Sequence, residues 1–280
     1  DAYKAEIMEA GDTIVEGGES VVFTMQPQAA VTIIDQYTGD VKAIVGGRGD
    51  KTGSRTLNRA TGTTRQPGSA FKVLAAFAPA LDTAGMTLAT VQDDAPFSYA
   101  NGTSLRNYDN TYRGFTTIRY AITKSINVVT VKTLTDISPQ VGYDYLVNFG
   151  FTTLTEDDIV QSLALGGITQ GVTNLELTAA YATIADGGTY TKPRFYTRIL
   201  DHSGNVLIDN TQETHTVLKE STAFLLTSAM QDVVNVGTGG AVKFGNMPIA
   251  GKTGTTTKNR DALFSGFTPY YTCSVWCGYD

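Results

Sequence analysis

The chain has 280 residues, of which 41% are hydrophobic and 17% charged, and its formal net charge is −6. This length and apolar content allow a sizeable buried core and exclude a chain that is disordered throughout. The acidic balance and the lack of a basic run argue against nucleic acid as a partner.

No stretch of about 18 apolar residues is available to cross a membrane. The first residues, from Asp1 to Lys4, lack the charged and apolar regions of a signal peptide. We therefore expect any membrane anchor to lie outside this sequence.

Metal-ligating residues are few. Cys273 and Cys277 are the only cysteines, and His202 and His215 are the only histidines. Four residues apart on one strand, the cysteines would lie about 13 Å apart, which is too far for a disulfide. With both histidines far upstream, a four-ligand zinc site is poorly supported. We expect no metal or cofactor, and we interpret the cysteines as small buried hydrophobes.

The first predicted elements are a hairpin and a helix. Residues 30–34 and 41–45 are rich in β-formers and flank a turn-like segment, which predicts a β-hairpin. After a polar stretch from Gly46 to Gly68, apolar residues recur at helical spacing. We predict a helix that starts near Ser69 and is kinked or ended by Pro79.

Helical signals dominate the middle of the chain, over about residues 117–187. The clearest is the capping box from Thr173 to Glu176, whose helix should stop at Gly187 and Gly188.

Strand and helix signals then alternate to the end of the chain. A second small hairpin is predicted around the turn at residues 201–205, followed by a helix from Ser221 to about Asn235. Strand-like runs follow at residues 249–252, 262–267 and 271–276. We predict an α+β fold: an antiparallel sheet built from N- and C-terminal strands, flanked by helices, with a helical lobe inserted between them.

The segment from Ser69 to Lys72 places a hydroxyl and an amine three residues apart at a helix start, where such side chains are neighbours. Desolvation lowers the pKa of a lysine, and a neutral amine close to a serine is a base that can activate it. The backbone N–H of Ser69 can face a developing oxyanion. An isolated pair of this kind more often consists of an N-cap serine and a solvated lysine.

Two further polar segments are candidates for the same site. Ser125 and Asn127 lie where two helical runs meet, so a hydroxyl and an amide there could relay a proton and orient a lysine. Lys252, Thr253 and Gly254 lead into a strand-rich segment and could line a strand edge beside a cleft. A peptide with a terminal carboxylate near Lys252 could bind such an edge by adding to the sheet.

The three segments, S-x-x-K, S-x-N and K-T-G, occur in the order typical of penicillin-binding proteins and serine β-lactamases. The chain resembles the transpeptidase domain of class A (bifunctional) penicillin-binding proteins, in the penicilloyl-serine transferase superfamily. The resemblance covers nearly the whole chain from about Gln28 and includes the following matching segments: 65–72, 162–166, 172–177, 250–256 and 275–280.

The resemblance implies a role for each motif residue. Ser69 would be the acylated nucleophile, Lys72 its base, Ser125 the proton shuttle, and Asn127 a partner of Lys72 and of the donor amide. The donor strand and carboxylate would be bound by Lys252, Thr253, Gly254 and Thr255. The backbone N–H groups of Ser69 and Thr255 would form the oxyanion hole.

The reaction implied by the resemblance is cross-linking of peptidoglycan stem peptides through an acyl-serine, with β-lactams acting as donor mimics. By the same resemblance the domain would lie on the extracytoplasmic side of a bacterial membrane, and the natural chain would carry a glycosyltransferase domain. We expect residues 1–27 to be a residual linker and residues 28–280 to be the transpeptidase domain without the family's C-terminal helix. An apolar sheet face should then be incompletely covered, or be covered by a neighbouring element.

Four other functions use parts of the same sequence pattern. A serine β-lactamase shares the motifs, but no segment here resembles the glutamate loop that class A β-lactamases use for deacylation. A D,D-carboxypeptidase would use the same residues with water as acceptor, and a non-catalytic β-lactam sensor would acylate without turnover. A nucleotide-binding loop fails on glycine spacing, because Asn246 occupies the first glycine position of the phosphate loop.

Overall fold

The computed structural model describes residues 10–11, 13, 26–51, 53–256 and 260–280. The expected linker over residues 1–27 falls almost entirely outside this part. No helix of the described part is long and apolar enough to span a bilayer.

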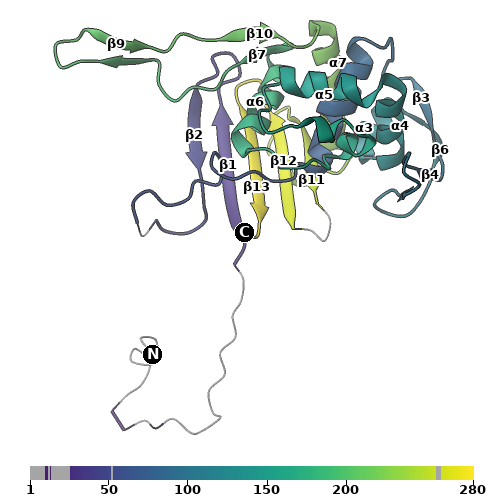
Figure 1. The fold of residues 1–280 in the computed structure, drawn as a ribbon, viewed down its shortest axis with the longest axis horizontal. Helices are drawn as coiled ribbons and strands as arrows, with labels where there is room; N and C mark the ends of the chain where they lie inside the picture. The colour runs from purple at the N-terminus through teal and green to yellow at the C-terminus, as the bar shows by residue number, and fades with distance from the viewer. Residues whose placement is uncertain (1–9, 12, 14–25, 52, 257–259) are drawn as a thin grey trace.

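One five-stranded sheet forms the centre of the fold, with strand order β11-β12-β13-β1-β2 (Figure 1). Its strands are β1 (Gln28–Ile34), β2 (Val41–Val45), β11 (Ala250–Thr255), β12 (Asp261–Phe267) and β13 (Thr272–Gly278). Every neighbouring pair is antiparallel, and β1 pairs with β13. The predicted α+β fold, its first hairpin and its sheet of N- and C-terminal strands are confirmed.

Short helices and two-stranded ribbons fill the remainder of the described chain. The helical segments are η1 (Gly68–Ala70), η2 (Val73–Phe77), α2 (Ala78–Asp82), α3 (Ile118–Lys124), α4 (Asn127–Ile137), α5 (Pro139–Asn148), η3 (Glu156–Asp158), η4 (Gln161–Leu165), α6 (Asn174–Ala185), α7 (Glu220–Asn235) and η5 (Gly240–Val242). The ribbons pair β3 (Val91–Asp94) with β6 (Gly114–Thr117), β4 (Phe97–Ser98) with β5 (Ser104–Leu105), β7 (Thr189–Thr191) with β10 (Thr214–Thr216), and β8 (Arg198–Leu200) with β9 (Val206–Asp209).

The helix predicted from Ser69 is irregular. It opens as the 3-10 turn η1, passes through the π-helical segment η2, and continues as α2 beyond Pro79 to Asp82. A proline has no N–H to donate, and its ring clashes with the carbonyl four residues earlier. The wider π-helical turn accommodates this, so Pro79 changes the helical register and does not end the helix.

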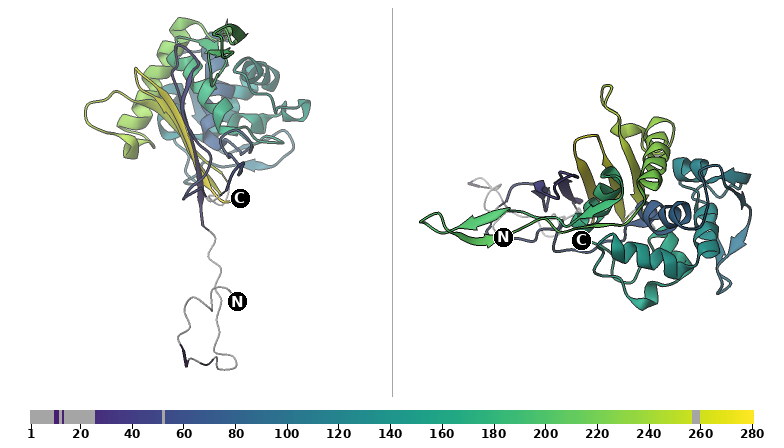
Figure 2. Two further views of the ribbon diagram at one scale, coloured as in Figure 1. Left: turned by 90° about the vertical axis from the view of Figure 1, so that its left-hand side faces the viewer. Right: turned by 90° about the horizontal axis from the view of Figure 1, so that it is seen from above.

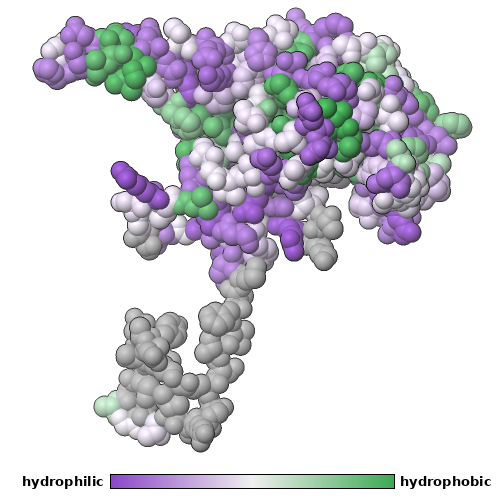
Figure 3. All heavy atoms as spheres, viewed as in Figure 1, coloured by the Kyte–Doolittle hydropathy of each residue, from purple (hydrophilic) through white to green (hydrophobic). Residues whose placement is uncertain are grey.

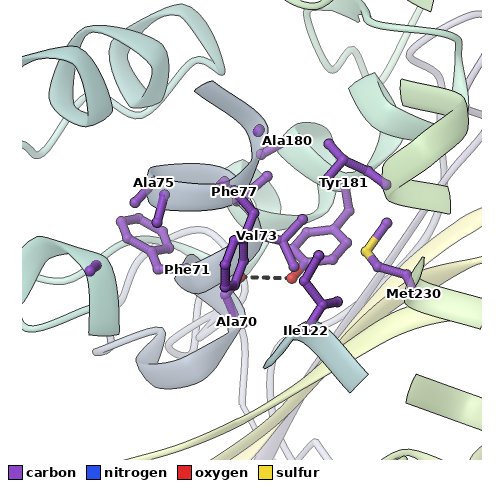
Figure 4. Packing of buried hydrophobic residues seen from close by; sticks show 14 of the residues in the cluster. Ala70, Phe71, Val73, Ala75, Phe77, Ile122, Ala180, Tyr181 and Met230 are labelled. Carbon is purple, nitrogen blue, oxygen red and sulfur yellow. Dashed lines mark hydrogen bonds between the residues drawn. The ribbon is translucent and has the colours of Figure 1, made fainter. Parts of the chain in front are cut away.

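Helix α6 covers one face of the sheet, and most of the helical segments lie on the same side (Figures 1 and 2). Thr173 caps α6 in the predicted capping box, and the helix ends before Gly187. From α6, the Tyr181 ring packs among buried hydrophobic side chains, and its hydroxyl donates to the Ala70 carbonyl at 2.7 Å (Figure 4). This contact joins the sheet-covering helix to the turn that carries Ser69.

The opposite face of the sheet is only partly covered within the described part. Val45 and Val275, which share that face through the β2-β1-β13 pairing, are 50% and 37% exposed. The expected incomplete cover of an apolar sheet face is therefore confirmed. Cys273 and Cys277 also lie on this face and are free thiols, half-buried and exposed respectively. The interpretation of both cysteines as buried was wrong, because alternation on β13 places them opposite the core.

The predicted second hairpin is an arm that projects from the body of the domain (Figures 1 and 2). Strands β8 and β9 form it, with residues 201–205 in the turn as predicted. Apolar side chains along the arm are exposed, among them Leu200 and Leu207, and they appear as a hydrophobic patch on its surface (Figure 3).

Candidate active site

The turn carrying Ser69 is packed directly against the sheet edge. Gly68 has φ +52°, and a Cβ there would lie 2.8 Å from the Thr255 carbonyl oxygen. A side chain is therefore excluded both by the backbone conformation and by the contact. The turn that holds Ser69 and the end of β11 that holds Thr255 are adjacent, as an oxyanion hole made from both backbones requires.

A second close approach lies one residue earlier on β11. A Cβ on Gly254 would lie 2.6 Å from the Pro67 carbonyl oxygen. The absent side chain lets the strand lie against the turn that carries Ser69. β11 is the end strand of the sheet and pairs with β12 along one edge only. Its unpaired edge faces this turn and the cleft.

Lys72 is fully buried one helical turn after Ser69. Its amine donates to the Asn127 Oδ1 and to the Ser125 carbonyl, each at 2.6 Å, and to the Ser125 Oγ at 3.2 Å. No hydrogen bond between Lys72 and the Ser69 Oγ is found in the described part. The amine thus contacts the second motif, while Ser69 lines the open cleft beside it.

Ser125 lies between the two lysines. It follows α3 in the left-handed region, with φ 57°, which brings both its carbonyl and its hydroxyl toward Lys72. From the other side, the fully buried Lys252 amine donates to the Ser125 Oγ at 2.8 Å. A single hydroxyl therefore joins the amines of the first and third motifs.

Burial shifts both amines toward their neutral form. Desolvation holds the pKa of Lys72 well below its ordinary value, and the nearby Lys252 adds to this. Desolvation also lowers the pKa of Lys252, to about 7. Their hydrogen-bond partners in the described structure are neutral oxygens, so no carboxylate offsets the cost of burying a charge. An amine in this state can accept a proton at neutral pH.

A cleft of about 1450 Å³ runs over these residues. Five predicted site residues line it, and Lys72, Lys252 and Gly254 lie beneath its surface. The five are Ser69, Ser125, Asn127, Thr253 and Thr255.

Several cleft residues were missed by sequence reasoning. Thr238, which lies in a glycine-rich segment, is 2.7 Å from Thr253, hydroxyl to hydroxyl. Tyr99, Tyr108 and Arg260 also line the cleft. No local pattern distinguishes them from ordinary loop residues.

Metal ligands do not gather anywhere in the described part, which contains no group of three or more His, Cys, Asp or Glu residues able to hold an ion.

Comparison with known proteins agrees with this geometry. Residues 29–279 match the family described as the penicillin-binding protein transpeptidase domain. Penicillin-binding protein 1A of Clostridium acetobutylicum is 38% identical over 270 residues, covering 91% of this chain and 33% of that protein. Penicillin-binding protein 1A/1B of Bacillus subtilis is 32% identical, with 93% and 30% covered. The chain thus spans about a third of the length of these relatives.

Solved structures show the same fold. Penicillin-binding protein 1A from Haemophilus influenzae superposes with a TM-score of 0.80 at 23% identity, over 91% of this chain and 43% of that one. PonA1 from Mycobacterium tuberculosis, solved in complex with penicillin V, gives 0.80 at 27% identity, over 91% and 69%. The chain belongs to the penicillin-binding protein transpeptidase family.

Proposed function

We propose that this domain is a serine-type D,D-transpeptidase that cross-links peptidoglycan stem peptides and is acylated by β-lactams. The observation that carries the proposal is the buried, pKa-lowered amine of Lys72, held by Ser125 and Asn127 beside the cleft that Ser69 lines. Family membership supports the same reading.

In the first half-reaction, the Ser69 Oγ attacks the carbonyl carbon of the penultimate D-Ala of a donor stem. Its proton passes to the Lys72 amine, and the new O–C bond gives a tetrahedral intermediate. The peptide C–N bond then breaks, and Ser125 delivers a proton to the departing D-Ala amine. Contacts of 3.2 and 2.8 Å from the Ser125 Oγ to the two lysine amines provide the path for that proton.

In the second half-reaction, an amine of a neighbouring stem attacks the ester. The ester O–C bond breaks, the amine loses a proton to the base, and Ser69 recovers its own. A cleft of about 1450 Å³ exceeds the few hundred to about 1,000 Å³ of a drug-sized site, which suits a site that must hold two peptides.

The third motif would bind the donor. We assign Lys252 and Thr253, with Gly254 and Thr255 beside them, to the donor strand and its carboxylate. The N–H groups of Ser69 and Thr255 would stabilise the oxyanion. The adjacency of the two backbones, through Gly68, supports this assignment.

A serine β-lactamase is less well supported. The acidic residues lining the described cleft are Asp261 and Asp280, and each is occupied. Asp261 accepts from Trp276, and Asp280 pairs with Arg59 and Arg65. Because both carboxylates are engaged in structural contacts, neither is well suited to act as a deacylating base, and we expect a long-lived acyl-enzyme.

The whole protein would extend beyond this domain. Because the chain spans about a third of relatives named penicillin-binding protein 1A, we propose that the natural protein carries a glycosyltransferase domain. We place the domain on the extracytoplasmic side of a bacterial membrane, reached through an anchor outside this sequence, with residues 28–280 as the transpeptidase unit.

The test is intact mass after incubation with a penicillin, comparing wild type with Ser69→Ala. A stable one-drug adduct on the wild type that is absent from the variant supports the acyl-serine. Drug consumed without an adduct identifies a β-lactamase. Intact drug and no adduct on a protein that melts cooperatively would overturn the assignment of Ser69.

A second assay separates the remaining alternatives. The domain is given a D-Ala-D-Ala donor peptide and a D-amino acid as acceptor, and the products are resolved by mass. Acceptor incorporation supports a transpeptidase. Hydrolysis alone indicates a carboxypeptidase, and acylation by penicillin without any peptide turnover indicates a sensor.

A further inference from the structure

Helix α4 begins with Asn127 but does not cap itself. Its N-cap residue is Ile126, which has no side-chain oxygen to accept from the first backbone N–H groups. Backbone N–H groups without a cap at a buried helix start destabilise the helix unless another group accepts their hydrogen bonds.

Asn107, a buried residue 20 positions earlier, supplies the cap. Its Oδ1 accepts from the backbone N–H of Asn127 at 3.0 Å and from that of Val128 at 3.2 Å. The residue next to it takes part as well, because the Asn127 Nδ2 donates to the Arg106 carbonyl at 2.8 Å. The segment around Asn107 therefore holds both the backbone and the side-chain amide of Asn127.

The orientation of the Asn107 amide is determined by its other partners. Its Nδ2 donates to the Asp94 Oδ1 at 2.7 Å and to the Thr111 carbonyl at 2.8 Å. The Asp94 side chain is fully buried, and its other oxygen accepts from the Arg113 backbone N–H at 3.1 Å. With a carboxylate and a carbonyl on one side and two N–H donors on the other, the amide has one satisfactory orientation.

We propose that Asn107, oriented by Asp94, is a positioning residue that holds the Asn127 Oδ1 against the Lys72 amine. The Asn127 Nδ2 bond to Arg106 directs the Oδ1 of the same amide to Lys72, at 2.6 Å. Asn107 does not reach the cleft, so its effect on the reaction passes through Asn127. The proposal deepens the proposed function and rests on it.

The test exchanges the donor and the acceptor. Asn107→Asp places a second carboxylate against Asp94 and the Thr111 carbonyl, which should displace the α4 start. Combining it with Asp94→Asn restores a donor, at position 94, opposite the new carboxylate and leaves the net charge unchanged, while the Thr111 carbonyl still lacks its donor. Ser138→Ala is the matched control, because it removes the N-cap of α5, a helix that carries no motif residue.

Acylation by penicillin is resolved into the dissociation constant and the first-order acylation rate. For folded Asn107→Asp we expect the rate to fall about 10- to 100-fold, since misplacement of a catalytic group by about 1 Å costs about 100-fold. Drug binding should change less than the acylation rate does, because the third motif is untouched and Asn127 is assigned a single contact, with the donor amide. The double variant should recover the rate to within tenfold of wild type, because the contact at position 94 is restored while the Thr111 carbonyl still lacks its donor. Ser138→Ala should lower urea stability alone.

Each contrary result overturns the proposal: an unchanged rate in folded Asn107→Asp, or a folded double variant that stays more than tenfold slow. If Asn107→Asp does not fold, the double variant is judged directly against wild type by the same limits. Crystal structures provide a readout that needs no acylation, so failure of the proposed function remains distinguishable. We expect the Asn127 Oδ1 to Lys72 Nζ distance to exceed 3.5 Å in Asn107→Asp and to return in the double variant, and an unmoved Asn127 would refute the role.

Discussion

Replacing Gly254 with alanine tests how closely the position of the turn that carries Ser69 depends on strand β11. The new Cβ would lie 2.6 Å from the Pro67 carbonyl oxygen and 3.3 Å from both the Ala70 Cβ and the Leu263 Cβ. To reach an ordinary contact of about 3.4 Å, β11 and the turn must separate by about 0.8 Å. None of the three atoms approached is the end of a flexible side chain that could move aside.

The expected effect follows from that displacement. A misplacement of about 1 Å costs about 100-fold in rate, so we expect Ser69 acylation to slow about 10- to 100-fold. In activation free energy this is about 1.4–2.7 kcal/mol. Overpacking should also lower the free energy of unfolding by about 1–3 kcal/mol.

The assay is the second-order rate constant for acylation by a penicillin, followed by intact mass, with urea unfolding measured in parallel. Gly240→Ala is the matched control, since a Cβ there would have no neighbour closer than 3.9 Å and that glycine follows Thr238, which lines the cleft, by two residues. Wild-type acylation in folded Gly254→Ala would refute the claim that the close approach sets the geometry of the site.

Two further predictions concern stability. The pKa of Lys252 is lowered to about 7 on folding, so between about pH 7 and its unfolded value near 10.4 the unfolded state binds more protons. The free energy of unfolding should therefore rise with pH across that window, and urea titrations should show a flatter rise in Lys252→Met; an equal slope would contradict the shift. Tyr181→Phe leaves the buried Ala70 carbonyl without its donor. We expect a loss of about 1–3 kcal/mol, seen as a lower thermal midpoint, and an unchanged midpoint would show that the bond contributes nothing net.

Features set by local sequence were predictable. The capping box at Thr173 and the turn at residues 201–205 each depend on side chains within a few positions, and both occur where predicted. The motif order also brought distant segments correctly into one cleft. The prediction succeeded because Ser69, Ser125 and Lys252 each lie at the end or edge of a helix or strand whose type could be predicted from its local sequence.

Features set by distant contacts were not predictable from the sequence. Asn107 is one polar residue in a loop, and only the folded chain shows that it caps a helix 20 residues later. The π-helical turn before Pro79 depends on what packs around it, and the exposure of Cys277 depends on which face of the sheet the helices cover. In each case tertiary packing selects one of several local conformations, contacts or exposures that the sequence alone does not distinguish.

The pairing of β1 with β13 joins residue 28 to residue 278 and has a consequence for biosynthesis. During translation, the β1–β2 hairpin leaves the ribosome with one edge unpaired until β13 follows, and the turn that carries Ser69 lacks its partner strand until β11 has emerged. Long-range strand pairing of this kind folds slowly, and an open edge can pair with other chains. The turn that carries Ser69 therefore reaches its final geometry only after nearly all of residues 28–280 have been made, so a nascent chain that stalls before β11 would be exposed to aggregation.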